Sequence, residues 1–367
     1  MPGVTIVGAG VVGATIAYEV SRQPGFAVTL VDRAQPAGGS TGAALGVAMA
    51  VISQRAKGRN WRLRSQSLQR YHTLLPELEA LTGQTLQRNT QGILTLCRKS
   101  ESLDRWRSLQ EIRRRQGYDL QLWSAPEVAE HCPHLALDGV VGAIYSPQDL
   151  QLNPSQLTQA LVTGAQQQGA TLILGEAVLG FSWEADSTRR HCTRVHTPQR
   201  SWTTDVVVLA AGLGCLGLTT TLEFPLAIAP VLGQAARLHL DHPLGQPHFQ
   251  PVVNCDDVHL VPLGQGDYWV GATVETAGED LAAPPDPGQL DQVIAAAVAY
   301  CPGLGAARVS DRWFGYRPRP QNQPAPVIQP LAGYDNVWLA TGHYRNGVLL
   351  APATAQVICD HLKTLGP

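Results

Sequence analysis

The N-terminal segment alternates short apolar runs with one longer apolar stretch. Val4 to Val7 and Val28 to Val31 are rich in β-branched residues, and the stretch from Val11 to Val20 between them has the composition of a buried helix. Glycines separate the three pieces, and Asp32 follows the last one. The order strand, turn, helix, strand predicts a βαβ unit whose two strands are parallel.

Comparable patterns recur later in the chain. Residues 205–212 form an apolar run that ends in small residues, which is typical of a parallel strand buried on both faces. A strand at 337–340 and a helix from about Val348 form a similar C-terminal pair. Between these pieces, short β-like runs from 224 to 274 alternate with proline and glycine and predict an antiparallel sheet. The proline-containing stretch 122–152 is expected to be irregular.

A chain of 367 residues is long enough for two domains. The pattern predicts an α/β fold with a discontinuous, Rossmann-like nucleotide-binding domain formed by residues 1–85, 150–222 and 311–367. A substrate-binding domain of the α+β type with an antiparallel sheet, formed by residues 86–149 and 223–310, is expected to interrupt it twice.

Composition and charge exclude several classes of protein. Lys and Arg total 27 against 29 Asp and Glu, and a net charge of −2 gives no general attraction to nucleic acid. Hydrophobic residues make up 44% of the chain, which excludes a disordered protein. No apolar run reaches the roughly 18 residues of a transmembrane helix, and the N-terminus lacks the basic start of a signal peptide. Seven scattered cysteines without a C-x-x-C pair favour reduced thiols and a cytoplasmic location, and predict no metal site.

Gly8, Gly10 and Gly13 have the G-x-G-x-x-G spacing of a dinucleotide-binding turn. The first glycine allows the tight turn, the second lets a pyrophosphate approach the backbone, and the third lets helix and strand pack closely. The helix N-terminus that follows offers free N–H groups to the phosphates. Asp32, at the end of the second strand, can accept hydrogen bonds from ribose hydroxyls and opposes a 2′-phosphate. This segment does not decide between NAD and FAD.

Several further segments make the chain recognisable. They are residues 38–46, 205–212, 269–273, 312–318 and, above all, 341–354, which reads T-G-H-Y-R-N-G-V-L-L-A-P-A-T. With the N-terminal fingerprint, they resemble the D-amino-acid oxidase family of FAD-dependent amine oxidoreductases, most closely its glycine oxidase branch. The resemblance spans the whole chain, although its middle matches loosely.

The resemblance implies FAD as the cofactor. The residues expected to hold it are Gly8, Gly10, Val12, Gly13, Asp32, Arg33, Ser40, Thr41, Ala44, Gly46, Val178, Ala211, Gly212, Gly342, Arg345, Asn346, Gly347 and Val348. Some sarcosine-oxidase relatives attach the flavin to a cysteine after the segment that matches Arg317-Pro318. Residues 317–331 contain no cysteine here, so non-covalent binding is expected.

The resemblance also assigns the substrate side. Arg317 is similar to the carboxylate-binding arginine of glycine oxidases, and a planar guanidinium suits a carboxylate. Arg345 is a second candidate, either for substrate or for tying down the flavin loop. His259 stands where glycine oxidases carry a tyrosine, and beside a carboxylate its charged form would be favoured; the alternative is a histidine satisfied within the sheet. These three residues are the predicted catalytic set.

The implied reaction is oxidation of glycine or another small amino acid or amine by hydride transfer to flavin N5, with O2 as the acceptor. Such enzymes supply an imine for the thiazole of thiamine. Four alternatives stay open: a D-amino-acid dehydrogenase that reduces a quinone, a secondary-amine oxidase acting on sarcosine or proline, an NAD-dependent dehydrogenase, and a non-catalytic binding module. The only lysines are Lys57, Lys99 and Lys363, none in the middle region where some relatives set a lysine over the flavin.

A basic stretch follows the nucleotide-binding segment. No acidic residue occurs from Arg33 to Pro76, and Arg55 to Arg70 carries six cations. It is either a solvated helix face or a surface that attracts an acidic substrate or a redox partner; nucleic-acid binding is not expected because no aromatic platform accompanies it. The sequence does not decide whether the chain forms a homo-oligomer.

Overall fold

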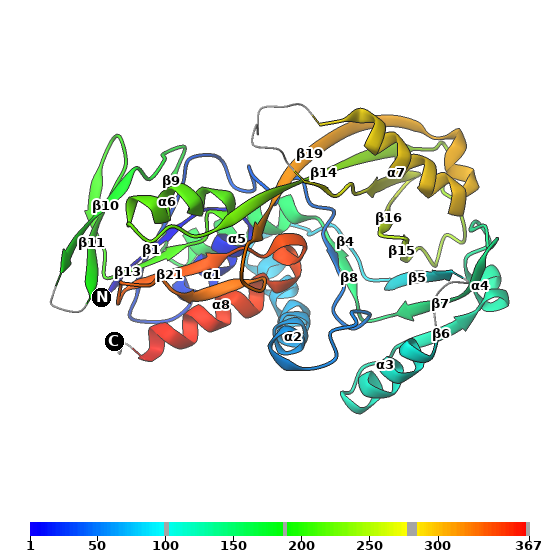
Figure 1. The fold of residues 1–367 in the computed structure, drawn as a ribbon, viewed down its shortest axis with the longest axis horizontal. Coiled ribbons are helices and arrows are strands. Elements are labelled where there is room, and N and C mark those ends of the chain that lie inside the picture. Colours follow the sequence, from blue (N-terminus) through cyan, green and yellow to red (C-terminus); the bar gives the residue numbers. More distant parts are fainter. Residues whose placement is uncertain (99–102, 186–188, 277–284, 365–367) are drawn as a thin grey trace.

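A computed structural model describes residues 1–98, 103–185, 189–276 and 285–364. Two sheets lie side by side, with helices on their outer faces (Figure 1). The first sheet has six strands in the order β20 (Val327–Pro330), β21 (Val337–Thr341), β13 (Val206–Leu209), β1 (Gly3–Val7), β2 (Ala27–Asp32) and β9 (Thr171–Leu174). All neighbours are parallel except β20.

The predicted βαβ unit is present. Helix α1 (Val11–Ser21) joins β1 to β2, and Val4 pairs in register with Val28. Helices α1, α5 (Pro154–Gln167) and α8 (Gly347–Thr364) pack together on one face of the sheet. The other face is covered by α6 (Cys215–Thr221) and by a small antiparallel sheet of β10 (Gly180–Ala185), β11 (Arg190–His196) and β12 (Ser201–Thr203). Strands β1, β2 and β13 are buried because both faces are covered.

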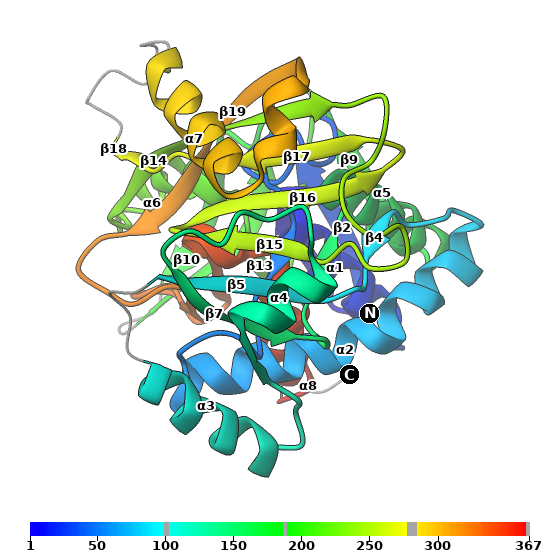
Figure 2. The ribbon, with the colours of Figure 1, turned by 90° about the vertical axis from the view of Figure 1, so that its right-hand side faces the viewer.

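The second sheet has nine strands and faces the viewer in Figure 2. Its order is β18 (Glu275–Thr276), β14 (Ile228–His239), β17 (Asp267–Gly271), β16 (Val258–Gly264), β15 (Val252–Cys255), β5 (Ile93–Arg98), β7 (Val140–Ser146) and β6 (Gln121–Ser124), with β19 (Arg308–Pro320) also paired to β14. The predicted antiparallel sheet is confirmed for all pairs but one: β5 and β15 are parallel. The long β19 includes residue 311, the predicted domain boundary.

Shorter elements complete the fold. A three-stranded sheet of β3 (Val47–Ala48), β8 (Leu150–Leu152) and β4 (Arg88–Asn89) lies where the chain crosses between the two large sheets, and α7 (Pro287–Tyr300) packs on the second sheet. Helices α2 (Gly58–Thr82) and α3 (Leu103–Arg115) lie along the lower side in Figure 2, whereas α4 (Ala125–His131) packs on β6 and β7 near the centre of that view.

The expectation that residues 122–152 are irregular was wrong. They contain the end of β6, helix α4, and strands β7 and β8. Pro126 lies in the first turn of α4, where a missing N–H costs nothing. Ser124 and Glu127 form a capping box there, so the S-x-x-E spacing was the signal for a helix start.

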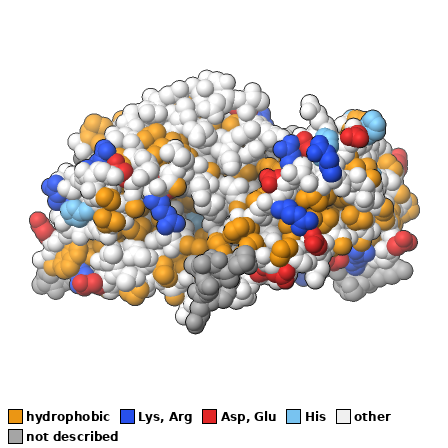
Figure 3. All heavy atoms as spheres, turned by 90° about the horizontal axis from the view of Figure 1, so that it is seen from above, with side chains coloured by type: hydrophobic (Ala, Val, Ile, Leu, Met, Phe, Trp, Pro, Cys, Tyr) orange, Lys and Arg blue, Asp and Glu red, His pale blue; other side chains and the backbone are white. Residues whose placement is uncertain are grey.

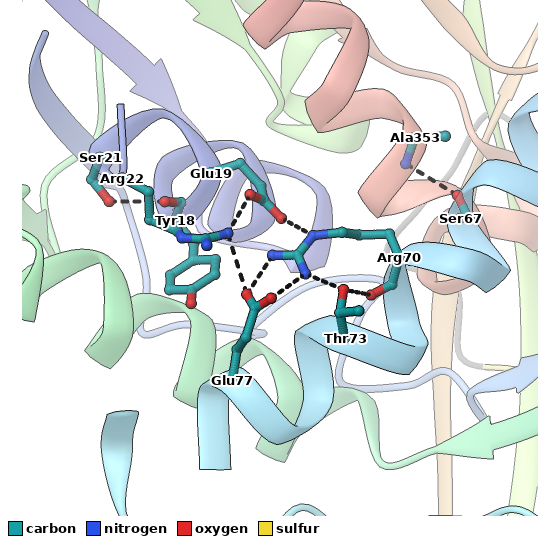
Figure 4. Close-up of polar contacts among 9 residues, drawn as sticks. All are labelled: Tyr18, Glu19, Ser21, Arg22, Ser67, Arg70, Thr73, Glu77 and Ala353. Carbon is teal, nitrogen blue, oxygen red and sulfur yellow. Dashed lines mark hydrogen bonds and ion pairs between the residues drawn. The ribbon is translucent and has the colours of Figure 1, made fainter. Parts of the chain in front are cut away.

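Helix α8 is tied to α2 at its proline. Pro352 has no N–H for the carbonyl of Val348, and the Tyr71 hydroxyl donates a hydrogen bond to that carbonyl instead. The backbone N–H of Ala353 donates to Ser67 Oγ at 3.1 Å (Figure 4). Since both ties reach the first turns of α8, helix α2 fixes the position of the loop that precedes α8.

Four charged side chains join α1 to α2 (Figure 4). Arg70 donates from Nε to Glu19 at 2.7 Å and from both terminal nitrogens to the Glu77 carboxylate at 2.9 and 2.7 Å. Arg22 pairs with the same two glutamates at 3.1 and 3.2 Å. Burial raises the pKa of Glu77, but the hydrogen bonds and charge of Arg70 outweigh it and hold that pKa below its ordinary value.

This network gives a pH-dependent prediction for stability. Because the pKa of Glu77 is lowered in the folded protein, its contribution is present above its unfolded pKa and is lost as the pH falls through the folded pKa. We expect Arg70→Met to lower the melting temperature at about pH 7 and to differ much less from wild type at about pH 3. Arg115→Met on exposed α3 is the control and should melt like wild type. An equal deficit at both pH values would contradict the prediction.

Candidate active site

A cavity of about 770 Å³ lies between the nucleotide-binding sheet and the nine-stranded sheet. It is lined by the first βα turn, the loop 38–47, the middle of β19, and the loop 341–348. The predicted residues that line it are Gly8, Gly10, Val12, Asp32, Arg33, Ser40, Thr41, Ala44, Gly46, Val178, Ala211, Gly212, His259, Arg317, Gly342, Arg345, Gly347 and Val348. Gly13 and Asn346 do not line the cavity.

The glycines of the fingerprint act in different ways. Gly8 has φ +115°, and a Cβ there would lie 2.6 Å from the carbonyl oxygen of Ala210. A Cβ on Gly13 would lie 1.8 Å from the carbonyl oxygen of Gly8, so Gly13 serves the packing of α1 against β1 and lies outside the cavity. Gly10 precedes α1 without a capping side chain, and the N–H of Val11 points to Thr41 Oγ1 at 3.1 Å. The first turn of α1 therefore presents N–H groups to the cavity.

Asp32 is held at the edge of the cavity by two backbone groups. Its Oδ2 accepts from the N–H of Ala9 at 2.6 Å, and its Oδ1 accepts from the N–H of Ala34 at 2.8 Å. A carboxylate offers about four acceptor positions, so both oxygens can still accept from the two ribose hydroxyls of an adenosine. The site fits the adenosine and pyrophosphate parts of a dinucleotide.

The loop 38–47 closes the cavity from the side of β19. Ser40 donates from its hydroxyl to the carbonyl of Tyr316. A Cβ on Gly315 would lie 2.4 Å from the Cβ of Ala43, and one on Gly46 would lie 1.8 Å from the carbonyl of Leu152. Gly315 therefore lets β19 pack closely against the loop, and Gly46 lets the loop pack closely against β8. The loop also lines the cavity.

The loop before α8 forms the remaining wall. Thr341 donates to the carbonyl of Gly212 at 3.1 Å, and α8 begins at Gly347 with its first turn at the cavity. The hydroxyl of Thr354 donates to the carbonyl of Leu350 at 2.8 Å, so it accepts from Nε2–H of His343, also at 2.8 Å. Burial lowers the pKa of His343 to about 3, which keeps the ring neutral. A neutral His343 and a helix N-terminus at this wall suit the electron-rich edge of a flavin.

Arg317 projects from β19 into the cavity. Its Nη1 donates to the carbonyls of Leu232 at 3.1 Å and Thr273 at 3.0 Å, which fixes the guanidinium. A Cβ on Gly233 would lie 2.2 Å from Arg317 Nη2, so only glycine leaves room for this arginine. Burial, then the neighbouring Arg345, lower the pKa of Arg317, but a guanidinium remains charged at neutral pH. Sequence reasoning found Arg317 and missed Gly233, which carries no motif.

His259 and Arg345 stand near Arg317. Nδ1 of His259 is buried and has no hydrogen-bond partner among the described residues, so the ring is not satisfied within the sheet. Burial, followed by the charge of Arg345, lowers the pKa of His259 to about 4. In the ligand-free protein the histidine is therefore neutral at pH 7, whereas a charged form was expected beside a carboxylate. Arg345 pairs with exposed Asp257 at 3.3 Å.

Buried charges that no motif predicted hold the backbone of residues 49–55. Asp149 accepts from the N–H groups of Ala50, Val51 and Ile52 at 2.7, 2.8 and 2.8 Å. Two arginines bind backbone carbonyls of the same segment. Arg113 donates to the carbonyls of residues 51, 53 and 55, and Arg64 donates to the carbonyl of residue 49. Burial raises the pKa of Asp149, while these backbone hydrogen bonds act against the rise.

Arg64 links this segment to the loop before α8. It donates to the carbonyl of Met49 at 2.7 Å and to Oδ1 of Asn346 at 3.0 Å. Asn346, predicted as a cofactor contact, is thus turned to Arg64. Burial lowers the pKa of Arg64 to about 10, and the charge of Asp149 partly offsets this. The segment 49–55 and the loop 341–348 are therefore joined through Arg64.

The basic stretch is only partly a surface feature. Arg64 and Arg70 are engaged inside the protein, and Arg55, Lys57, Arg59 and Arg62 are the exposed members. Of these, Arg59 donates to the carbonyl of Pro326 at 3.0 Å. Basic and acidic side chains are interspersed on the face of the molecule seen in Figure 3. Among the described residues, no helix is both long and apolar enough to cross a membrane, and no cluster of three potential metal ligands occurs.

A dinucleotide turn, an acid placed for ribose, a helix N-terminus at the opposite wall and a partly buried arginine are the groups that a flavin-dependent oxidoreductase needs in its active site. Residues 3–361 match the model of the FAD-dependent oxidoreductase family, and the chain belongs to this family. FAD is accordingly its cofactor.

Named relatives agree with the family. The chain is 32% identical to the bifunctional protein ThiO/ThiG of Synechocystis over 97% of its length and 51% of the relative. It is 28% identical to glycine oxidase of Bacillus subtilis, covering 97% of this chain and 91% of that one. The crystal structure of glycine oxidase from Geobacillus kaustophilus superposes with a TM-score of 0.87 at 26% identity, over 99% of this chain and 95% of that one. The chain thus spans about half the length of its ThiO/ThiG relatives.

The cavity gives a prediction for how FAD is bound. All seven cysteines are buried and form no disulfide, and none lines the cavity. We therefore expect a yellow protein whose flavin appears entirely in the supernatant after acid precipitation, measured by absorbance and identified as FAD by chromatography. Flavin that stays with the protein pellet would show a covalent bond and contradict the prediction.

Proposed function

We propose that the protein oxidises glycine or another small amine-bearing acid to the imine and passes the electrons to O2. The observation that carries this proposal is Arg317, a partly buried guanidinium fixed by two backbone carbonyls in the same cavity as the dinucleotide-binding turn. A planar guanidinium binds a carboxylate through two parallel hydrogen bonds. The glycine oxidases among the relatives, similar over nearly the whole chain, support the same substrate class.

Arg317 would hold the substrate carboxylate and so orient the rest of the molecule. With Nη1 engaged by Leu232 and Thr273, the other nitrogens of the guanidinium can donate to the carboxylate. Neutral His259 has an unpartnered ring nitrogen that can form a further hydrogen bond. Arg345 adds positive charge, which favours binding of an anion. The residues orient the substrate, and none of them needs to act as a dedicated base.

When bound, FAD supplies the two-electron acceptor that takes the Cα hydrogen as hydride. The chain contributes the loop 341–348, which lines the cavity and is held through Arg64 against the segment 49–55. The released imine hydrolyses to an oxo acid and ammonia, or serves a later biosynthetic step. The ThiO/ThiG relatives favour the thiazole of thiamine as that step. We propose a cytoplasmic location, in keeping with seven cysteines that form no disulfide.

An anaerobic titration tests this function. Glycine, sarcosine, D-alanine and D-proline are added to the yellow protein without oxygen, and flavin absorbance is followed. We expect bleaching by glycine or another small amine-bearing acid, and full recovery of absorbance with hydrogen peroxide formation when air is readmitted. Bleaching that air does not reverse, but a quinone does, would replace the oxidase with a dehydrogenase. No bleaching by any amino acid would refute the proposal.

A further inference from the structure

Three polar side chains lie next to one another on the face of the nine-stranded sheet that meets the nucleotide-binding domain. They are Thr95 on β5, Asn254 on β15 and His259 on β16, and Asn254 is the register partner of both others. Side chains alternate between the two faces of a strand. Leu94 and Val253, the strand neighbours, belong to the core on the opposite face. The three side chains therefore form one row, here called the polar row.

The polar row is not satisfied within the protein. Thr95 Oγ1, Asn254 Oδ1 and His259 Nδ1 are buried and have no hydrogen-bond partner among the described residues, and Asn254 is only 8% exposed. A buried polar atom without a partner costs stability, so native proteins contain few of them. Three such atoms in adjacent register positions point to a ligand that completes them.

The polar row begins at the substrate cavity. His259 lines that cavity together with Arg317. On one side His259 pairs in register with Asn254, so Asn254 and Thr95 lie directly behind His259, outside the cavity lining. On the other side it pairs with Gly271, where Leu45 packs against the sheet face. The backbone of the same strand region also holds Arg317, through the carbonyl of Thr273. A substrate whose carboxylate meets Arg317 therefore shares the cavity with His259, the member of the polar row that faces it.

We infer that Thr95 and Asn254 extend the substrate site beyond His259 and form a subsite for a neutral hydrogen-bonding group, a hydroxyl or carboxamide, on the substrate's second arm. This inference rests on the proposed function. A charged arm does not suit the subsite, because hydrogen bonds to three uncharged groups do not offset the free energy that is lost when an ion leaves water. Arg345, the charged neighbour of His259, already forms an ion pair with Asp257.

Two pairs of amino acids with nearly equal shapes test the subsite. Serine is compared with 2-aminobutyrate, and asparagine with leucine, each in both enantiomers, with glycine as the reference substrate. The rate of anaerobic flavin reduction is measured at low substrate concentration. For the enantiomer that reacts, we expect the polar member of at least one pair to be faster by about 5- to 150-fold, because only it completes the buried polar atoms.

Variants then assign the preference to the polar row. Asn254→Leu and Thr95→Val keep the side-chain volume and remove the hydrogen-bonding group. We expect Asn254→Leu to abolish or reverse the polar preference and Thr95→Val to reduce it. Neither variant should lower the melting temperature, since each replaces an unpartnered polar atom. Thr171→Val, an isosteric change at an exposed strand end, is the matched control and should keep the preference.

The outcomes separate the subsite from the function. If glycine reduces the flavin but the polar and apolar members of both pairs react equally, the inference is wrong and the proposed function stands. If no amino acid reduces the flavin, the proposed function fails first. A polar preference that survives in both Asn254→Leu and Thr95→Val would also overturn the inference, because it would have to arise elsewhere in the cavity.

Discussion

Arg317→Ala is expected to lower kcat/KM for the best small amino acid by roughly thirty-fold to several thousand-fold. A buried carboxylate that loses its guanidinium costs about 2–5 kcal/mol, which corresponds to that range of rates. The guanidinium is held by the carbonyls of Leu232 and Thr273 before substrate arrives, so the loss includes its orientation. The measurement is the rate and apparent affinity of anaerobic flavin reduction.

Two further variants define the role of Arg317. Arg317→Lys should recover little activity, because an ammonium group cannot reproduce two parallel hydrogen bonds. Arg312→Ala, on the same strand but exposed and paired with Asp291, should behave like wild type. FAD content should stay normal in all three. If Arg317→Ala keeps wild-type rate and affinity, the carboxylate is held elsewhere, with Arg345 as the next candidate.

Asp149→Asn is expected to cause the largest loss of stability. The carboxylate accepts three backbone N–H groups and is fully buried with Arg64 and Arg113 nearby. An amide has one acceptor oxygen, so its NH2 group would face a backbone donor, and the two buried cations would lose their counter-charge. Removing one partner of such a buried group costs about 3–5 kcal/mol, or roughly 5–15 °C in apparent melting temperature.

Calorimetry and flavin fluorescence measure the effect of Asp149→Asn. We expect lower stability together with easier release of FAD, since the segment 49–55 is joined through Arg64 to the loop before α8. Asp241→Asn, at an exposed position, is the matched control and should match wild type. A melting temperature within about 2 °C of wild type would show that the carboxylate does not anchor this segment.

The dinucleotide-binding half could be predicted because its signals are local. The strand before Gly8, the helix after Gly10 and the acid at Asp32 lie within one short stretch, and their spacing follows from the geometry of the phosphate-binding turn. The polar residue Asn346 illustrates the limit of such reasoning. It lies in the right motif, but its side chain is turned to Arg64 by the packing of α2.

The substrate side depends on contacts between distant segments. Arg317 could be named from its motif, but the carbonyls and the glycine that fix it come from residues 232, 273 and 233 on other strands. Thr95 joins the polar row only because β5 pairs with β15 in parallel. Parallel strands are not joined by a short hairpin turn, so no local sequence signal predicts this pairing.

Short-range spacing and apolar periodicity in the sequence by themselves determined the course of the nucleotide-binding strands. The family and the cofactor followed from the motifs in which the sequence resembles FAD-dependent amine oxidoreductases. Only the tertiary structure decided which charges are buried and which face solvent. Asp149 lies 99 positions from Ala50 in the chain, yet its carboxylate holds that backbone. Arg70 was one member of a basic stretch in the sequence, and the packing of α2 on α1 made it the centre of an ion-pair network. The sequence specifies which side chains are charged, but the packing of distant elements determines which partner each of them meets.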